Sequence, residues 1–108
     1  MAVSKTEVWQ RKLFQIGAGL TVDIDYCPFL QMQHIEYIIH FKNDTNTDSK
    51  SLNMSVKKSD INVQETVASL LGKLDVIIAP QVVGADYVLR ITNNESFAVN
   101  GSFAKAFL

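Results

Sequence analysis

The chain has 108 residues, enough for one domain with one hydrophobic core, so we predict that residues 1–108 form a single domain. Hydrophobic residues make up 47% and charged residues 19% of the chain, and ten basic against eleven acidic side chains give a net charge of -1, which argues against a disordered protein. This near-neutral balance also lacks the strong positive field of nucleic-acid-binding proteins, so no nucleic-acid partner is expected.

The N-terminal composition and the cysteine content bear on the cellular compartment. Residues 1–12 are polar and charged, and no apolar run reaches the roughly 20 residues that span a bilayer. We therefore predict an N-terminal arm at residues 1–12, no membrane span, and a cytoplasmic protein, or a secreted one if an upstream signal peptide was removed. Cys27 is the only cysteine, which excludes an internal disulfide and a zinc site with several cysteines.

Three strands are predicted in the first half of the chain. Apolar residues occupy every second position over residues 14–26, which predicts a long strand with a bulge or bend at residues 17–19. Residues 34–42 alternate in the same way, and residues 52–57 form a third, shorter run. The apolar faces of the second and third strands consist of Ile35, Tyr37, Ile39 and Phe41, and of Leu52, Met54 and Val56.

The apolar spacing changes near residue 60. Apolar residues then recur at helical spacing, and Asn62 followed by Glu65 fits an N-terminal capping pair, so residues 61–74 are predicted to form a helix. The apolar positions of this helix are Val63, Val67, Leu70, Leu71 and Leu74.

Strands are predicted again after the helix. Pro80 lies inside the apolar run 76–83 and cannot donate to a ladder, so this strand should be an edge strand, bulged or broken. Gly84 begins a turn into another strand at residues 87–92. Asn100-Gly101 lies between extended segments, which predicts a closing hairpin at residues 97–103.

Together these elements predict an α+β fold. It consists of a curled antiparallel β-sheet of about six strands packed against one central helix, in the order β-β-β-α-β-β followed by a β hairpin. One short helix is too narrow to cover such a sheet, so apolar surface should remain for a partner, and we predict a homo-oligomer.

A cluster of carboxylates and a histidine is the candidate ligand or metal site. If the strands at residues 14–26 and 34–42 pair as a hairpin, Asp23, Asp25 and Glu36 share one face with His34. Two or three of these groups could bind a cation or hold one carboxylic acid protonated. The simpler interpretation is a solvated strand face, which we favour because any half-buried strand alternates in this way.

The function predicted from these features is binding or assembly without catalysis and without a cofactor. No nucleophile with an orienting base, phosphate-binding loop or zinc-binding helix motif is recognisable. We expect a small accessory, adaptor or inhibitory protein of phage, viral or bacterial origin, with a protein partner or a second copy of itself. Sheet edges and the terminal hairpin should dock the partner, through Pro80, Gln81, Val82, Val83, Phe103 and Phe107.

Two alternatives belong to other classes. The carboxylate and histidine cluster could serve a metal- or small-ligand-binding enzyme. A secreted, glycosylated surface or protease-inhibitor domain would explain four Asn-x-Ser/Thr triplets, which begin at Asn43, Asn53, Asn94 and Asn100. Residues 81–87 also resemble the QxVxG loop of cystatins, but the glycine comes one position early and the second-loop Pro-Trp is missing, so no family is assigned.

Overall fold

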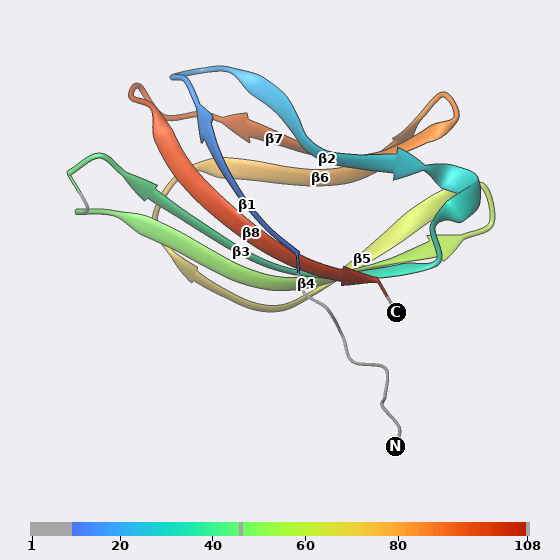
Figure 1. Cartoon of the computed structure of the whole chain (residues 1–108). Coiled ribbons are helices and arrows are strands. Elements are labelled where there is room, and N and C mark those ends of the chain that lie inside the picture. Colours follow the sequence, from blue (N-terminus) through green and yellow to red (C-terminus); the bar gives the residue numbers. More distant parts are fainter. Residues whose placement is uncertain (1–9, 46, 108) are drawn as a thin grey trace.

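The structure is a computed structural model that describes residues 10–45 and 47–107 (Figure 1). The predicted arm at residues 1–12 therefore lies mostly outside the described residues, and the first strand begins at Gln10. The described part of the chain offers no helix with the length and apolar character that a membrane crossing requires. Its elements are β1 (Gln10–Ile16), β2 (Thr21–Pro28), the 3-10 helix η1 (Phe29–Gln31), β3 (His34–Asn43), β4 (Ser49–Ser59), β5 (Asn62–Gly72), β6 (Val76–Val83), β7 (Asp86–Asn93) and β8 (Val99–Phe107).

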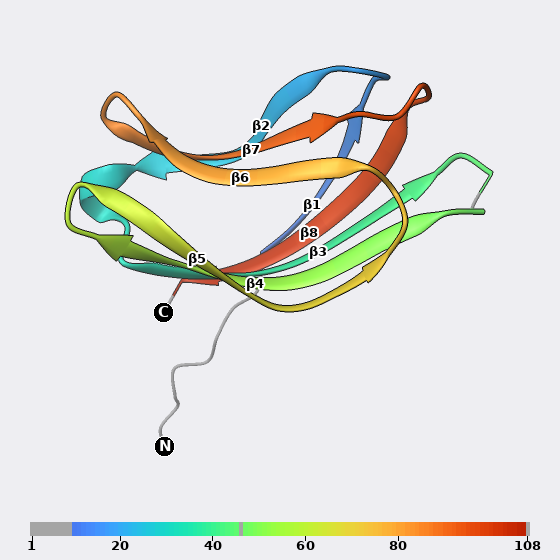
Figure 2. The ribbon, with the colours of Figure 1, turned by 180° about the vertical axis from the view of Figure 1, so that it is seen from behind.

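The strands form two antiparallel sheets that lie face to face (Figures 1 and 2). One sheet has five strands in the order β1-β8-β3-β4-β5, and the other has three in the order β2-β7-β6. The prediction of antiparallel pairing is confirmed. The α+β prediction with one curled sheet is wrong, because the fold is an all-β sandwich.

The predicted helix at residues 61–74 is the edge strand β5. The ladder between β4 and β5 shifts register between Asn53 and Met54, so Ala68 is an extra residue on β5. This bulge brings Val63, Val67 and Leu70 to the same face of the strand. The same positions share one face of a helix, so the apolar spacing fits both structures. β-branched residues and a long neighbouring strand favour the extended form.

The hydrophobic core lies between the two sheets. The predicted apolar faces of β3 and β4 are confirmed, since all seven of their residues are buried. The helix that was expected to cover the sheet is replaced by the three-stranded sheet, whose β7 supplies the largest share of the facing core residues. The buried core consists of Ile16, Met32, Ile35, Tyr37, Ile39, Phe41, Leu52, Met54, Val56, Leu74, Val76, Tyr87, Leu89, Ile91, Val99 and Phe103.

The long alternating run at residues 14–26 contributes to both sheets. Gly19 has a φ of 71°, and Leu20 N donates to Gly17 O at 3.1 Å, so the chain turns there and passes from β1 in one sheet to β2 in the other. The expected bend at residues 17–19 is therefore confirmed, but the prediction of a single long strand over residues 14–26 is wrong, because the chain changes sheets at this bend. The expected hairpin between residues 14–26 and 34–42 is wrong, because β2 pairs with β7 and β3 pairs with β4 and β8.

The predicted closing hairpin at residues 97–103 is also wrong, because Asn100 and Gly101 lie inside β8, between β1 and β3. Gly101 has no positive φ. Its hydrogen side chain instead admits the ring of Phe14, since a Cβ atom at Gly101 would lie 2.2 Å from Phe14 Cζ. The glycine serves close packing between neighbouring strands and not a turn.

The segment after Gly72 follows the sequence prediction more closely. β6 is an edge of the three-stranded sheet, which confirms one of the three arrangements expected from Pro80. Gly84 has a φ of 62° and lies in the turn that joins β6 to β7 as a hairpin. Pro80, Gln81, Val82 and Val83 therefore all lie on an edge strand.

Candidate functional site

A buried network of polar side chains connects the two sheets. A bulge between Asp23 and Asp25 in β2 turns Asp25 into the interior, where it is 3% exposed. Lys105 Nζ donates to Asp25 Oδ1 at 2.7 Å, and the Tyr37 hydroxyl donates to Asp25 Oδ2 at 2.8 Å. The Tyr37 hydroxyl is also 2.7 Å from the hydroxyl of Tyr87. Residues of β2, β3, β7 and β8 thus meet at one point.

The hydrogen bonds of this network stabilise the packing of the two sheets against each other. Burial raises the pKa of Tyr37 and of Tyr87, so both phenols stay protonated. Burial, and then the neighbouring Asp25 carboxylate, raise the pKa of Cys27, so its thiol is not an activated nucleophile. Among the described residues, no buried side-chain nitrogen or oxygen lacks a hydrogen-bond partner. Such a satisfied network holds the two sheets in one arrangement.

The predicted carboxylate and histidine cluster is not assembled. Asp25 is inside the sandwich, whereas Asp23 forms a two-bond ion pair with Arg90, at 2.8 and 3.1 Å, on the outer surface of the three-stranded sheet. Only His34 and Glu36 are brought together, with 2.5 Å between Nε2 and Oε2, on the outer face of the other sheet. Across residues 10–45 and 47–107, no group of three or more His, Cys, Asp or Glu side chains could hold a metal ion.

Glu36 is held in place by two neighbours. Ser55 Oγ donates to Glu36 Oε2 at 2.5 Å, and this bond, more than the His34 contact, lowers the pKa of the carboxyl. The carboxylate is thus fixed beside β4, and its hydrogen bond with Ser55 connects β3 to β4 on the outer face of the sheet.

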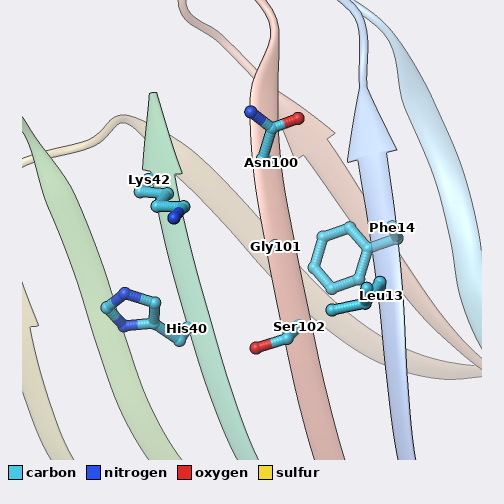
Figure 3. Close-up of a pocket in the computed structure, with 7 residues that line it drawn as sticks. All are labelled: Leu13, Phe14, His40, Lys42, Asn100, Gly101 and Ser102. Atoms are coloured by element: carbon cyan, nitrogen blue, oxygen red, sulfur yellow. The ribbon is translucent and has the colours of Figure 1, made fainter. Parts of the chain in front are cut away.

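A hollow on the outer face of the five-stranded sheet is a second candidate site, and it is accessible from solvent (Figure 3). Its volume is about 430 Å³. Figure 3 shows Leu13 extending from β1 toward β8, with Ser102 on the floor and His40 on the opposite side. It is lined by Leu13, Phe14, His40, Lys42, Asn100, Gly101 and Ser102.

We call the outer surface of β8 around this hollow, with the side chains beside it on β1 and β3, the outer trough. The floor is β8, whose outward side chains are Asn100, Ser102 and Ala104. The register places them beside larger residues on both neighbouring strands, and these larger residues form the walls. The walls are Arg11, Leu13 and Gln15 on β1, and Ile38, His40 and Lys42 on β3.

The sandwich is open between β5 and β6, where side chains of both strands line a groove. Val67 and Leu70 pair with the core residues Met54 and Leu52, so they face the interior side of the sheet. They are nevertheless 43% and 55% exposed, because the three-stranded sheet ends at β6 and does not extend over β5. A groove of about 190 Å³ lies here, and burial in it raises the pKa of Glu65.

Two predicted docking residues differ in accessibility. Phe103 is 1% exposed, because β8 lies between β1 and β3 and its inward face is core, so it cannot contact a partner. Phe107, at the end of the same strand, is 50% exposed. The prediction that both residues lie on an interaction surface is wrong for Phe103, because it depended on the hairpin that does not form.

These features define the chain as an antiparallel β-sandwich with an open side and a trough across its larger sheet. The fold is similar to part of the tailspike protein of Acinetobacter baumannii phage AM24, with a TM-score of 0.52 and 8% sequence identity. The similarity covers 93% of this chain but only 26% of the tailspike chain, so the likeness concerns the fold alone. No protein-family model matches the sequence. No curated protein sequence matches it either.

Lys105 and Tyr87 belong to the network but were not singled out from the sequence, and Tyr37 was predicted only as part of an apolar strand face. A lysine at an inward position of a strand is a signal in principle, because lysine is seldom buried without a partner. The outer trough also left a trace in the sequence, since small side chains alternate along β8. Neither trace identifies its neighbours, which come from distant parts of the chain.

Proposed function

We propose that this chain is a non-catalytic binding and assembly protein that associates with a second copy of itself through β5. One observation supports the proposal most strongly: β5 is an edge strand of eleven residues on which every residue except Val63 is exposed. An edge strand presents unpaired N–H and C=O groups that can pair with another strand.

The four sheet edges differ in their protection. Natural edge strands are usually blocked by prolines or by charged residues, above all lysine. β5 has no proline, lysine or arginine, and Glu65 is its only charged residue. The other edges are protected by Arg11 and Lys12 in β1, Pro28 in β2 and Pro80 in β6.

The apolar side chains of β5 also favour a partner. Val67 and Leu70 face the interior side without a covering sheet, and Leu71 on the opposite face is 71% exposed. A strand added beside β5 would extend the five-stranded sheet and bring further side chains to both faces. Burial of this apolar surface would stabilise the association by roughly 25 cal/mol per Å² before the entropy cost of binding.

The setting that the fold likeness supports is a phage protein. The similarity to part of a phage tailspike protein is in the fold and not in the sequence. It agrees with a binding or assembly function in a phage, and it supports no catalytic activity for this chain.

The self-association is tested by light scattering coupled to size-exclusion chromatography at micromolar concentration. We expect the unaltered chain to have a mass above that of the 12.1 kDa monomer. The double variant Val67→Lys/Leu71→Lys should be a monomer, because lysine side chains on an edge oppose strand pairing.

The matched control is Ile77→Lys/Val83→Lys. It places two lysines at exposed apolar positions of β6, where Ile77 and Val83 are 53% and 44% exposed. This variant should keep the mass of the unaltered chain. A monomeric unaltered chain at every concentration tested would contradict the proposal, as would equal effects of the two double variants.

A further inference from the structure

We propose that β5 pairs with β5 of a second copy in antiparallel orientation, about a two-fold axis at Glu65, and that protonation of the two opposed Glu65 carboxyls controls the association. This arrangement rests on the proposed self-association through β5, and it adds a register and a regulation to that association. The variants that test it change the register or the charge of β5, so they can fail while self-association itself stands.

The ladder with β4 divides β5 into two segments. Residues 62–67 pair with β4 without interruption, Ala68 is the extra residue of the bulge, and Gly72 turns the chain with a φ of 104°. A bulge bends its strand and leaves a residue unpaired, so a second strand can pair continuously only with a regular edge. Residues 62–67 are therefore the segment of β5 to which a further strand can be added.

The side chains of this segment alternate between the two faces of the sheet. Glu65 and Val67 stand opposite the buried residues Val56 and Met54, so they face the interior side, as does Val63. A two-fold axis perpendicular to the sheet keeps the interior side the same in both copies. Each interior residue of one copy must then stand opposite an interior residue of the other, because a shift by one residue would exchange the faces.

Of the registers that meet this condition, the one centred on Glu65 opposes the most apolar surface. It places Val63 of each copy opposite Val67 of the other, and direct cross-strand pairs of β-branched residues stabilise a sheet. An axis at Gln64 would set Val63 opposite Glu65, and an axis at Thr66 would set Val67 opposite Glu65. Both of these registers lose the valine pairs.

This register also brings the two Glu65 side chains directly opposite each other, with their Cβ atoms about 5 Å apart. Glu65 shares its groove with the apolar side chains of Met54, Val67 and Ile78, and burial there already raises the pKa of its carboxyl in a single copy. Two carboxylates opposed in such surroundings repel each other. When one of them is protonated, it can donate a hydrogen bond to the other, so the pairing is favoured.

The described charged and titratable groups near Glu65 are engaged elsewhere. Lys50 lines the same groove, but its Nζ donates to a backbone carbonyl at 3.1 Å. Lys58 on β4 has its ammonium group 4.4 Å from the centre of an aromatic ring, and the Tyr87 hydroxyl on β7 lies 2.7 Å from another buried hydroxyl. The side chains that β6 presents to the groove are apolar. Association therefore takes up protons, so it should weaken as the pH rises through the raised pKa of Glu65.

Disulfide trapping tests the register. In a Cys27→Ser background, Glu65→Cys should form a disulfide-linked dimer under mild oxidation, because directly opposed Cα atoms are about 4.5–5.5 Å apart, within the range of a disulfide. Val67→Cys is the matched control on the same face. Its two thiols would be about 13 Å apart along the strands, so this variant should stay unlinked. Equal linkage of both variants, or linkage of neither in a chain that is dimeric, would overturn the register.

Sedimentation velocity at about pH 5 and about pH 8 tests the regulation. The dissociation constant of the unaltered dimer should increase at least about tenfold between these two values. Glu65→Gln should associate equally at both, because its two opposed amides are neutral and can bond to each other. Glu95→Gln removes the same charge between β7 and β8, outside β5, and should keep the pH dependence of the unaltered chain.

The possible results separate regulation from self-association. A dimer whose affinity does not change with pH, or a Glu65→Gln dimer that is as sensitive to pH as the unaltered one, would overturn the control by Glu65 and leave self-association intact. A monomer at both pH values, in the unaltered chain and in Glu65→Gln alike, would overturn both proposals. Circular dichroism checks that each variant is folded.

Discussion

Replacement of Lys105 by alanine is expected to lower the free energy of unfolding by about 3–5 kcal/mol. The side chains of Lys105 and Asp25 are 9% and 3% exposed and lie 2.7 Å apart. Without the ammonium group, the Asp25 carboxylate stays buried with the Tyr37 hydroxyl as its remaining partner in the network. Urea denaturation followed by circular dichroism measures the change.

The double variant Lys105→Met/Asp25→Leu separates charge from packing. Replacing a buried ion pair by apolar residues of similar volume is often neutral or stabilising, so this variant should recover most of the lost stability. Asp23→Ala, which breaks an ion pair at the surface, should have a much smaller effect than Lys105→Ala. A loss below about 1 kcal/mol for Lys105→Ala would show that the pair is solvated in solution.

Replacement of Gly72 by alanine is the second large effect that we expect, with a loss of about 2–5 kcal/mol. Gly72 ends β5 with a φ of 104°, and a Cβ atom there would lie 2.1 Å from the carbonyl oxygen of Ser49. That oxygen accepts hydrogen bonds from Lys73 N at 2.8 Å and Leu74 N at 3.3 Å. Because the clash is with a backbone atom, the chain can relieve it only by moving away from Ser49. That movement would break the hydrogen bonds that hold the segment between β5 and β6 against Ser49.

Gly84→Ala is the matched control for this effect. Gly84 also has a positive φ, of 62°, but an added Cβ atom would meet nothing within 4 Å. Its loss should be about 1–2 kcal/mol, which is the conformational cost alone. Denaturant titration of both variants compares the two positions, and equal losses would mean that the close approach of Gly72 to Ser49 does not exist in solution.

The strands of the core could be predicted because each of them has one apolar face and one more polar face. Every second residue of β3 from Ile35 to Phe41 is buried, and the alternation predicted this face before any partner strand was known. The turns at residues 17–19 and at Gly84 were predictable for a related reason, since positive φ values favour glycine whatever the fold.

β5 could not be recognised because it is nearly all exposed. Its inward residues are only half covered and its bulge alters the period, so the spacing of Val63, Val67 and Leu70 fits a helix as well as a strand. Asn100 and Gly101 led to the wrong prediction of a hairpin for a different reason. A glycine that permits a turn and a glycine that admits a neighbouring ring, here Phe14, look the same in sequence.

The candidate sites were the least predictable features. Asp25 was expected on the solvent side of its strand, and the bulge in β2 turned it inward and left Tyr26 69% exposed. Its partner Lys105 is 80 residues away in the chain. A one-residue shift reverses the faces of a strand, so an unrecognised bulge is enough to misplace every polar group beyond it.

By itself, the sequence determined that this chain is built on antiparallel strands, with a buried face on β3 and β4 and a strand at Pro80 that must be an edge, bulged or broken. Composition and side-chain alternation are local properties, and they do not depend on which strands become neighbours. Only the tertiary structure decided that a second sheet covers the core, that Lys105 meets Asp25, and that β8 forms the floor of a trough. These features depend on pairings between distant segments, whose register is selected by the packing of the whole chain.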